Sequence, residues 1–146
     1  MSDRKNCTAM IVDDAFFMRN MLRSILEMEG YTVVAEAEDG EDAVVKYRAC
    51  RPDLVLMDIL MPVKNGIDAT REIISFDKDA CVVMCSIVWQ ELLVKEAREA
   101  GVQGVILKPF TTEEVVAVLQ KVMAAEFTMR KGGSRRKTET AKLMEC

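Results

Sequence analysis

The sequence predicts an α/β fold in which a parallel sheet is covered by helices on both faces. Short apolar segments alternate with segments of helical length and spacing five times along the chain. The segment 54–57, Leu-Val-Leu-Met, is apolar throughout, as in a central strand that is buried on both sides. The connections are about 2–6 residues long, the range typical of strand–helix units.

Each expected element is bounded by its own signals. The expected strands span residues 7–12, 31–36, 53–58, 80–85 and 102–107, and the expected helices span residues 15–29, 41–50, 67–75, 90–100 and 111–129. Gly30 and Gly101 follow helices, where glycine commonly ends them. Pro52 and Pro62 enclose the third strand because proline cannot continue a ladder. The pair Asn65-Gly66 is a strong turn signal before the third helix.

Helical spacing predicts which side of the first helix is buried. Apolar positions recur every three or four residues and form one stripe. This stripe contains Phe17, Met21, Leu22, Ile25 and Leu26. Arg19 and Arg23 are expected outside it. The last helix begins at Thr111 or Thr112 with Glu114, a typical capping pattern.

Composition limits the class of protein. The chain of 146 residues is half hydrophobic and carries a net charge of −4, which fits one globular domain without a nucleic-acid surface. It has no histidine, which excludes histidine-based catalysis and most zinc sites. Its five cysteines are an odd number without metal-ligand spacing, which favours free thiols in a reducing compartment.

Two parts of the chain are expected. Residues 1–130 form the folded domain, and 131–146 form a flexible basic tail, because Gly132-Gly133-Ser134 breaks the pattern. A solvated tail is favoured over nucleic-acid contact for its basic residues. We expect no signal peptide and no membrane span, and therefore a cytoplasmic location.

Polar residues follow four of the apolar strands. They are Asp13-Asp14, Asp58, Ser86 and Lys108. Because parallel strands end on one edge of the sheet, these side chains are expected to share one crevice. Asp58 alone would fit equally well as a cap of the next segment, but four such strand ends are hard to assign to capping.

The residue types in this crevice favour phosphoryl transfer. Carboxylates without histidine or cysteine favour a hard cation, Mg²⁺, or Mn²⁺ in its place. A carboxylate nucleophile, a metal ion, the cation of Lys108 and the hydroxyl of Ser86 together can neutralise a phosphoryl group during transfer. An aspartyl phosphate is an established covalent state of such a carboxylate.

Five sequence pieces resemble the receiver domain of two-component response regulators, most of all the single-domain chemotaxis type. They are Val12-Asp13-Asp14, the segment 56–62, Asn65-Gly66, Cys85-Ser86 and the segment 107–110. They occur in the expected order within residues 5–128. The resemblance implies a doubly wound, flavodoxin-like sheet of strand order 2-1-3-4-5 with five helices.

The resemblance also implies roles for individual residues. Asp58 would be the phosphoacceptor. The ligands that hold Mg²⁺ would be Asp13, Asp14, Asp58 itself and the backbone carbonyl of Leu60. Ser86 would bind a phosphoryl oxygen as the switch hydroxyl, and Lys108 would pair with the phosphoryl group. The peptide bond between Lys108 and Pro109 would be cis. The donor would be a phosphohistidine on a separate sensor histidine kinase.

The chain departs from the family pattern at the switch. Three residues before the lysine the family usually has Tyr or Phe, and here Val105 stands in that place. We expect output through Ser86, the loop through Trp89, and a partner that binds the face of helix 90–100, strand 102–107 and the last helix. Trp89 as a substitute switch ring and Trp89 as a half-buried cover remain alternatives.

Two other functions are alternatives to a stand-alone receiver. The first alternative is the receiver part of a larger regulator, whose output domain is missing or reduced to residues 131–146. The other alternative is an aspartate-nucleophile phosphatase. Those enzymes have the motif Asp-x-Asp after the first strand, and the segment Asp58-Ile59-Leu60 of this chain lacks the second Asp. We therefore expect a signalling domain rather than an enzyme that acts on external substrates.

Overall fold

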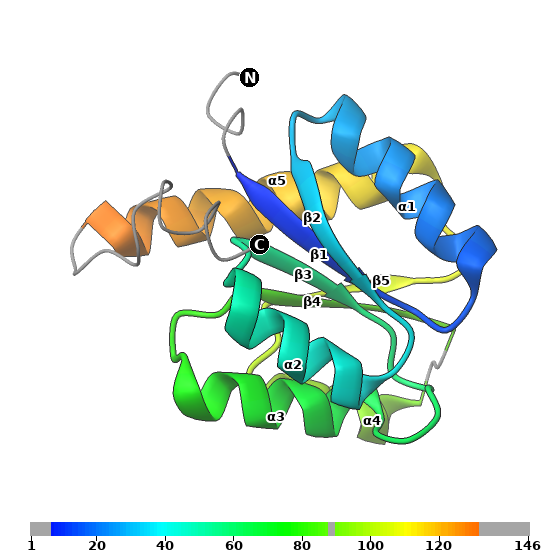
Figure 1. The fold of residues 1–146 in the computed structure, drawn as a ribbon. Coiled ribbons are helices and arrows are strands. Elements are labelled where there is room, and N and C mark those ends of the chain that lie inside the picture. The colour runs from blue at the N-terminus through cyan, green and yellow to red at the C-terminus, as the bar shows by residue number, and fades with distance from the viewer. Residues whose placement is uncertain (1–6, 88–89, 132–146) are drawn as a thin grey trace.

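A computed structural model describes residues 7–87 and 90–131. Strands and helices alternate along this part of the chain (Figure 1). The strands are β1 (Thr8–Val12), β2 (Thr32–Ala37), β3 (Leu54–Met57), β4 (Val82–Ser86) and β5 (Gly104–Leu107). The helices are α1 (Phe16–Met28), α2 (Gly40–Cys50), α3 (Gly66–Phe76), α4 (Glu91–Ala100) and α5 (Thr112–Lys131). The strands pair in parallel in the order β2-β1-β3-β4-β5, which confirms the predicted fold class.

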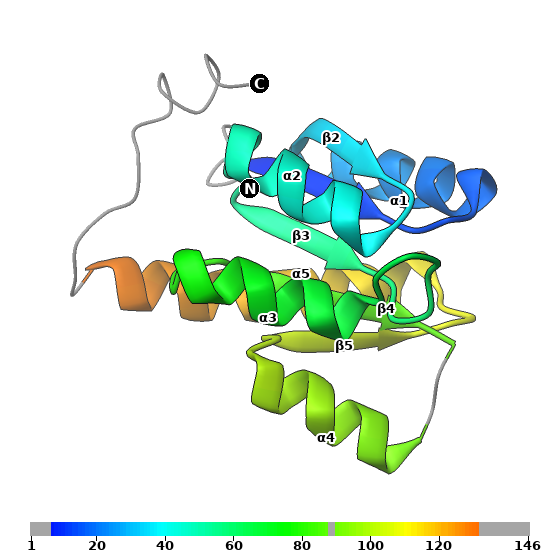
Figure 2. The ribbon, with the colours of Figure 1, turned by 60° about the horizontal axis from the view of Figure 1, so that its bottom comes forward.

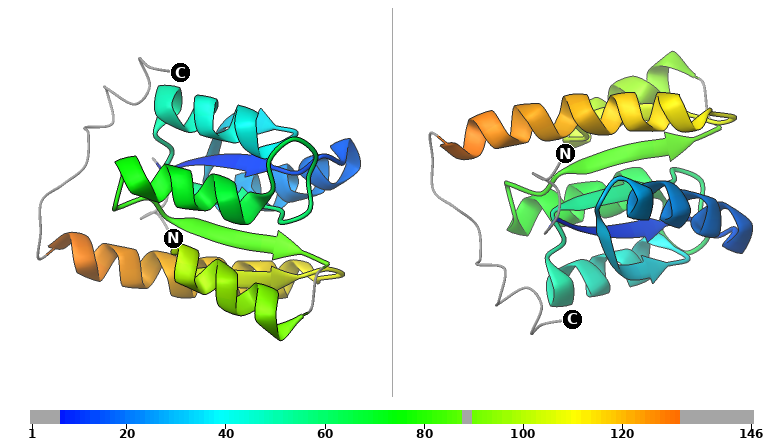
Figure 3. Two further views of the ribbon diagram at one scale, coloured as in Figure 1. Left: turned by 90° about the horizontal axis from the view of Figure 1, so that it is seen from below. Right: turned by 90° about the horizontal axis from the view of Figure 1, so that it is seen from above.

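The helices cover the sheet in two layers. Helices α1 and α5 lie over one face, and α2, α3 and α4 lie over the other (Figure 3). Successive residues of β3 alternate between the two cores: Leu54 and Leu56 pack toward α1 and α5, whereas Val55 and Met57 pack toward the opposite layer. Burial on both faces explains why this strand is a continuous apolar run, and each such side chain contributes about 1.5–3 kcal/mol.

The ends of several helices follow the signals in the sequence. The side chain of Asp39 accepts a hydrogen bond from the backbone of Asp42 at the start of α2, and Asn65 does the same for Asp68 in α3. Gly101 ends α4 with a φ angle of 115°, a left-handed conformation that glycine adopts readily. Observed and expected bounds differ by one or two residues, as element ends commonly do.

The expectation for the buried side of α1 is partly wrong. Leu22, Ile25 and Leu26 are buried as expected, but Phe17 is 71% exposed and Arg19 only 7%. Arg19 lies on the same side of the helix as Leu22 and Leu26, and its polar atoms bind groups at the sheet edge. Phe17 lies on the opposite side. Apolar spacing alone does not reveal a buried cation that has its own partners.

Residues 132–146 lie outside the described part of the chain, so the predicted tail boundary at 130/131 remains a prediction. Helix α5 continues to Lys131, slightly beyond its expected end. Within residues 7–87 and 90–131, none of the helices has the length and apolar character needed to cross a membrane. None of the cysteines in this part of the chain, Cys7, Cys50, Cys81 and Cys85, forms a disulfide bond.

Candidate phosphoryl-transfer site

The polar strand ends converge on one edge of the sheet. All the strands are parallel, so their carboxyl ends lie together, at the side of the sheet to which the arrowheads point (Figure 2). Asp13 and Asp14 follow β1, Asp58 follows β3, Ser86 ends β4 and Lys108 follows β5. Topology therefore places at one edge the side chains that the sequence predicts to meet.

Three carboxylates form the centre of this site. One carboxylate oxygen from each of Asp13, Asp14 and Asp58 lies within 4.8 Å of the others. Asp13 and Asp58 are buried, whereas Asp14 is exposed, so the cluster is open to solvent on one side. Oxygen donors in this number and arrangement suit a hard divalent cation, which would also offset the repulsion between the carboxylates.

Lys108 brings a cation into the same cluster. Its Nζ lies 2.7 Å from Oδ2 of Asp13 and 3.6 Å from Oδ2 of Asp58. Burial by itself would lower the pKa of Lys108, but the hydrogen bond to Asp13 and the attraction of both carboxylates outweigh burial and raise it above 10.5. The lysine is thus held as a permanent positive charge beside the acidic group.

Asp58 is a buried carboxylate held at several points. Its backbone N–H donates to the carbonyl of Val12, and its Oδ1 accepts from the backbone of Ile59 at 2.8 Å. Burial raises the pKa of Asp58 above 3.8, Lys108 opposes this rise, Asp13 adds to it, and a hydrogen bond from Ser86 lowers it. A fixed and partly desolvated carboxylate is a suitable nucleophile for a phosphorus centre.

The neighbouring thiol is not a competing nucleophile. Cys85 is buried next to Ser86, and desolvation raises the pKa of its thiol to about 12. Such a thiol stays protonated at neutral pH, and the thiolate is the nucleophilic form. Asp58 is therefore the better acceptor in this crevice.

Comparison with known proteins identifies the family. The family model described as "Response regulator receiver domain" matches residues 9–120. The chain belongs to the response regulator receiver family.

Its relatives include chemotaxis proteins. The chain is 49% identical over 113 residues to the chemotaxis protein CheY of Thermotoga maritima, covering 77% of this chain and 94% of that protein. It is 49% identical over 114 residues to protein CcdB of Bacillus subtilis, covering 78% and 95%. A solved CheX–CheY–BeF₃–Mg²⁺ complex from Borrelia burgdorferi has a chain with a TM-score of 0.78 and 36% identity, covering 80% of this chain and 89% of that one. This receiver thus has a CheY-like role in two-component signalling.

The loop between β3 and α3 returns to the backbone of Asp58 at the receiver site. A Cβ atom on Gly66 would lie 1.9 Å from the carbonyl oxygen of Asp58, so only glycine fits where the loop returns to the strand. Gly66 also donates its N–H to the carbonyl of Ile59 at 2.8 Å. Leu60 follows Ile59 in this loop and is 55% exposed. The metal-binding role of its backbone carbonyl remains a prediction.

Other predictions at the receiver site have different outcomes. The peptide bond between Lys108 and Pro109 is cis, as the family resemblance implies. Val105 is half-buried and packs against the core beneath α4. Trp89 lies outside the described residues, so its switch role stays a prediction.

Two residues near the site, Arg19 and Glu36, are not predicted by the sequence. Arg19 donates from Nη1 to the backbone carbonyl of Asp13 at 2.7 Å and from Nε to Glu36 at 2.8 Å. The only sequence signal for Arg19 is its position, as the fourth residue of a helix that follows an acidic pair. This position does not indicate that Glu36 is its partner. The pairing with Glu36 arises only when β2 lies beside α1.

Proposed function

We propose that this receiver accepts a phosphoryl group on Asp58 from a sensor histidine kinase and then changes its partner-binding face. The observation that carries the proposal is the meeting of Asp58 with Asp13, Asp14 and Lys108 in one crevice. Ser86 adds a hydroxyl to the same group. A stable fold needs none of these polar groups in contact, whereas phosphoryl transfer needs all of them.

The transfer step forms one bond and breaks another. A carboxylate oxygen of Asp58 bonds to phosphorus as the phosphorus–nitrogen bond to the donor histidine breaks, and the ring nitrogen keeps the bonding electron pair. Asp13, Asp14, Asp58 and the backbone carbonyl of Leu60 would hold Mg²⁺, which would neutralise charge on the phosphoryl oxygens. Lys108 moves its hydrogen bond from Asp13 to a phosphoryl oxygen, and the Ser86 hydroxyl donates to another.

The relative from Borrelia burgdorferi supports a metal-dependent phosphoryl state, since its structure contains BeF₃ and Mg²⁺. The chemistry of the three carboxylates in this chain fits the same cation. We also propose that the receiver acts in the cytoplasm, where its free thiols would remain reduced.

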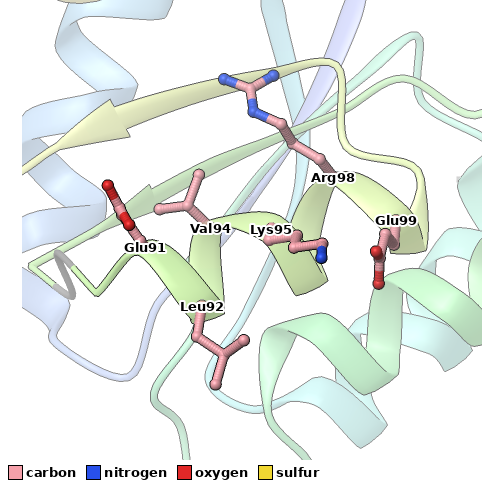
Figure 4. Close-up of a pocket in the computed structure, with 6 residues that line it drawn as sticks. All are labelled: Glu91, Leu92, Val94, Lys95, Arg98 and Glu99. Atoms are coloured by element: carbon pink, nitrogen blue, oxygen red, sulfur yellow. The ribbon is translucent and has the colours of Figure 1, made fainter.

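The output face is formed by α4, β5 and α5. Ser86 ends β4, the strand that precedes α4, so movement of its hydroxyl can be passed along the chain to α4. Val105 of β5 packs against the core beneath α4, so β5 can move together with this helix. A shallow cavity lies on α4, and its lining includes Leu92, which is 68% exposed (Figure 4). The charged side chains around it are Glu91, Lys95, Arg98 and Glu99. A downstream protein with an apolar anchor and a polar rim fits this face.

The switch can be tested with BeF₃⁻, which mimics a phosphoryl group on a carboxylate. Uniformly ¹⁵N-labelled protein is titrated with BeF₃⁻ in the presence of Mg²⁺. We expect amide shifts at the site and also in α4, β5 and the start of α5, and none of these in Asp58→Asn. Shifts confined to the site, or equal shifts in Asp58→Asn, would refute a switch centred on Asp58.

A further inference from the structure

We propose that Arg19 is a positioning residue for the metal site: paired with Glu36, it fixes the peptide that carries Asp13 and Asp14. This inference rests on the proposed function, because it concerns how the same site holds Mg²⁺. The guanidinium reaches back from the first turns of α1 and joins the end of β1 to β2. The helix that carries Arg19, α1, covers one face of the sheet together with α5 (Figure 3).

The three carboxylates of the site are not held equally. Asp13 accepts a hydrogen bond from the backbone of Ala15 and another from Lys108. Asp58 is held by Ile59 and Ser86. The Asp14 carboxylate is exposed, and within the described residues it has neither a hydrogen bond nor an ion pair. Its place therefore depends on the backbone that carries it.

Arg19 holds this backbone at its carbonyl end. The carbonyl of Asp13 belongs to the peptide that joins Asp13 to Asp14, and it accepts the 2.7 Å bond from Nη1 of Arg19. On the other side of Asp13, its N–H donates to the carbonyl of Ala37. Rotation of the joining peptide would turn the Asp14 carboxylate out of the cluster, and the bond from Arg19 opposes that rotation.

Glu36 permits a cation to be buried so near a metal site. It accepts from Nε of Arg19 at 2.8 Å and from Nε and Nη2 of Arg23 at 2.9 and 2.6 Å. An unpaired buried guanidinium would be costly and would repel a divalent cation. With Glu36 beside it and Glu38 at 3.8 Å, Arg19 supplies directed donors while nearby carboxylates offset its charge.

A β-bulge brings Glu36 to Arg19. The register between β1 and β2 shifts after Val33, so that Ala9 pairs with Val33 but Met10 pairs with Ala35. Val33 packs toward α1 and Ala35 toward α2, and Glu36 then falls on the α1 side. If the side chains of β2 alternated regularly from Val33 onward, Glu36 would face the other layer, so the bulge has the effect of aiming this side chain at α1.

The chain offers a matched control in Arg23. Arg23 binds the same Glu36, but its ion-pair and hydrogen-bond partners are Glu36 and Glu27 rather than Asp13. Arg19→Lys keeps the charge but cannot bridge two partners as the guanidinium does. Arg23→Lys makes the same chemical change to the other arginine that binds Glu36. Only the first variant should affect the metal site.

The experiment is an Mg²⁺ titration of ¹⁵N-labelled protein followed by amide shifts, together with thermal unfolding without metal. We expect Arg19→Lys to weaken Mg²⁺ affinity about tenfold and to shift the Asp14 amide before any metal is added. Arg23→Lys should bind within about twofold of wild type even where its stability falls. Glu36→Gln, which loosens Arg19 without replacing it, should weaken affinity several-fold and serves if Arg19→Lys does not fold.

Wild-type affinity in Arg19→Lys, or in Glu36→Gln if that variant is used instead, would overturn the inference. An equal loss in Arg23→Lys would overturn it as well, because the effect would then follow the ion pair and not the bond to Asp13. Wild-type protein and Asp14→Ala separate this failure from that of the proposed function. If wild type binds no Mg²⁺, or Asp14→Ala binds it equally well, the metal site itself is wrong.

Discussion

The ammonium group of Lys108 is hydrogen-bonded to Asp13, with 2.7 Å between Nζ and Oδ2. It lies farther from the expected acceptor, Asp58, at 3.6 Å. In this state the lysine is bound to a carboxylate that belongs to the candidate metal site. If Asp13 binds a metal ion as we propose, lysine and metal would compete for this carboxylate. The lysine would become free to approach a phosphoryl group when the metal takes its place.

This competition predicts the effect of Lys108→Met on metal binding. Removing a cation that lies within a few ångströms of the metal site should tighten Mg²⁺ binding about tenfold, or about 1.4 kcal/mol. The measurement is an Mg²⁺ titration at fixed ionic strength. Lys64→Met is the control, because it makes the same charge change at a lysine paired with Glu41 and Glu72. Equal tightening in both variants would show a general effect of net charge.

The raised pKa of Asp58 predicts that its charge destabilises the metal-free fold. Below its usual pKa of 3.8 the carboxyl is protonated in both the folded and unfolded states, and this cost is absent. As the pH rises through the higher pKa of the folded state, ionisation of the buried group lowers the free energy of unfolding.

Asp58→Asn should therefore be more stable than wild type at pH 7 in EDTA. We expect a gain of about 1 kcal/mol, or ~2–4 °C in midpoint, because the neutral amide avoids the cost of the buried charge. The gain should shrink as the pH falls toward 3.8. Thermal unfolding at several pH values measures it. A constant gain at all pH values, or a loss at pH 7, would contradict this account of Asp58.

The sequence predicts most of the site because the fold obeys one simple rule. Parallel strands end on a common edge, so the sequence alone places Asp58 and Lys108 together although they are fifty residues apart. The turn chemistry of Asn65 and Gly101 likewise depends on local conformation alone. The caps follow from local conformation, and the common edge follows from the parallel topology. Both can therefore be predicted from the sequence.

Features that depend on the contact of distant side chains are not predictable in this way. Hydrophobic spacing places Arg19 outside the buried stripe, because it treats every charged residue as exposed. The burial of Arg19 depends on Glu36, which reaches the α1 side only through a bulge in β2 that has no clear signal in the sequence. The same spacing places Phe17 inside the stripe, and Phe17 is exposed.

The lifetime of the phosphoryl group provides a further prediction. Leu60 lies two residues after the acceptor and is exposed, and an apolar side chain there cannot orient a hydrolytic water. We expect slow self-dephosphorylation compared with chemotaxis relatives, and about tenfold faster loss in Leu60→Asn. Val88, the second position expected to flank this approach, lies outside the described residues.

The measurement for Leu60 is loss of the phosphoryl group over time after donor removal. Val63→Asn is the matched control, since Val63 is an exposed apolar residue in the same loop. Its rate should stay near that of wild type. If wild type already loses the group as fast as Leu60→Asn does, the apolar side chain does not control the water.

The most direct test of the account is the site of phosphorylation. The protein is incubated with phosphoramidate and Mg²⁺, and intact-mass and peptide spectra locate the product. Asp53→Asn is the matched control, because Asp53 is also buried but lies at the opposite end of β3, where it binds Thr8. We predict one phosphoryl group on Asp58 in wild type and in Asp53→Asn, little without Mg²⁺, and none in Asp58→Asn. Full phosphorylation of Asp58→Asn at another residue would contradict the assignment of the acceptor.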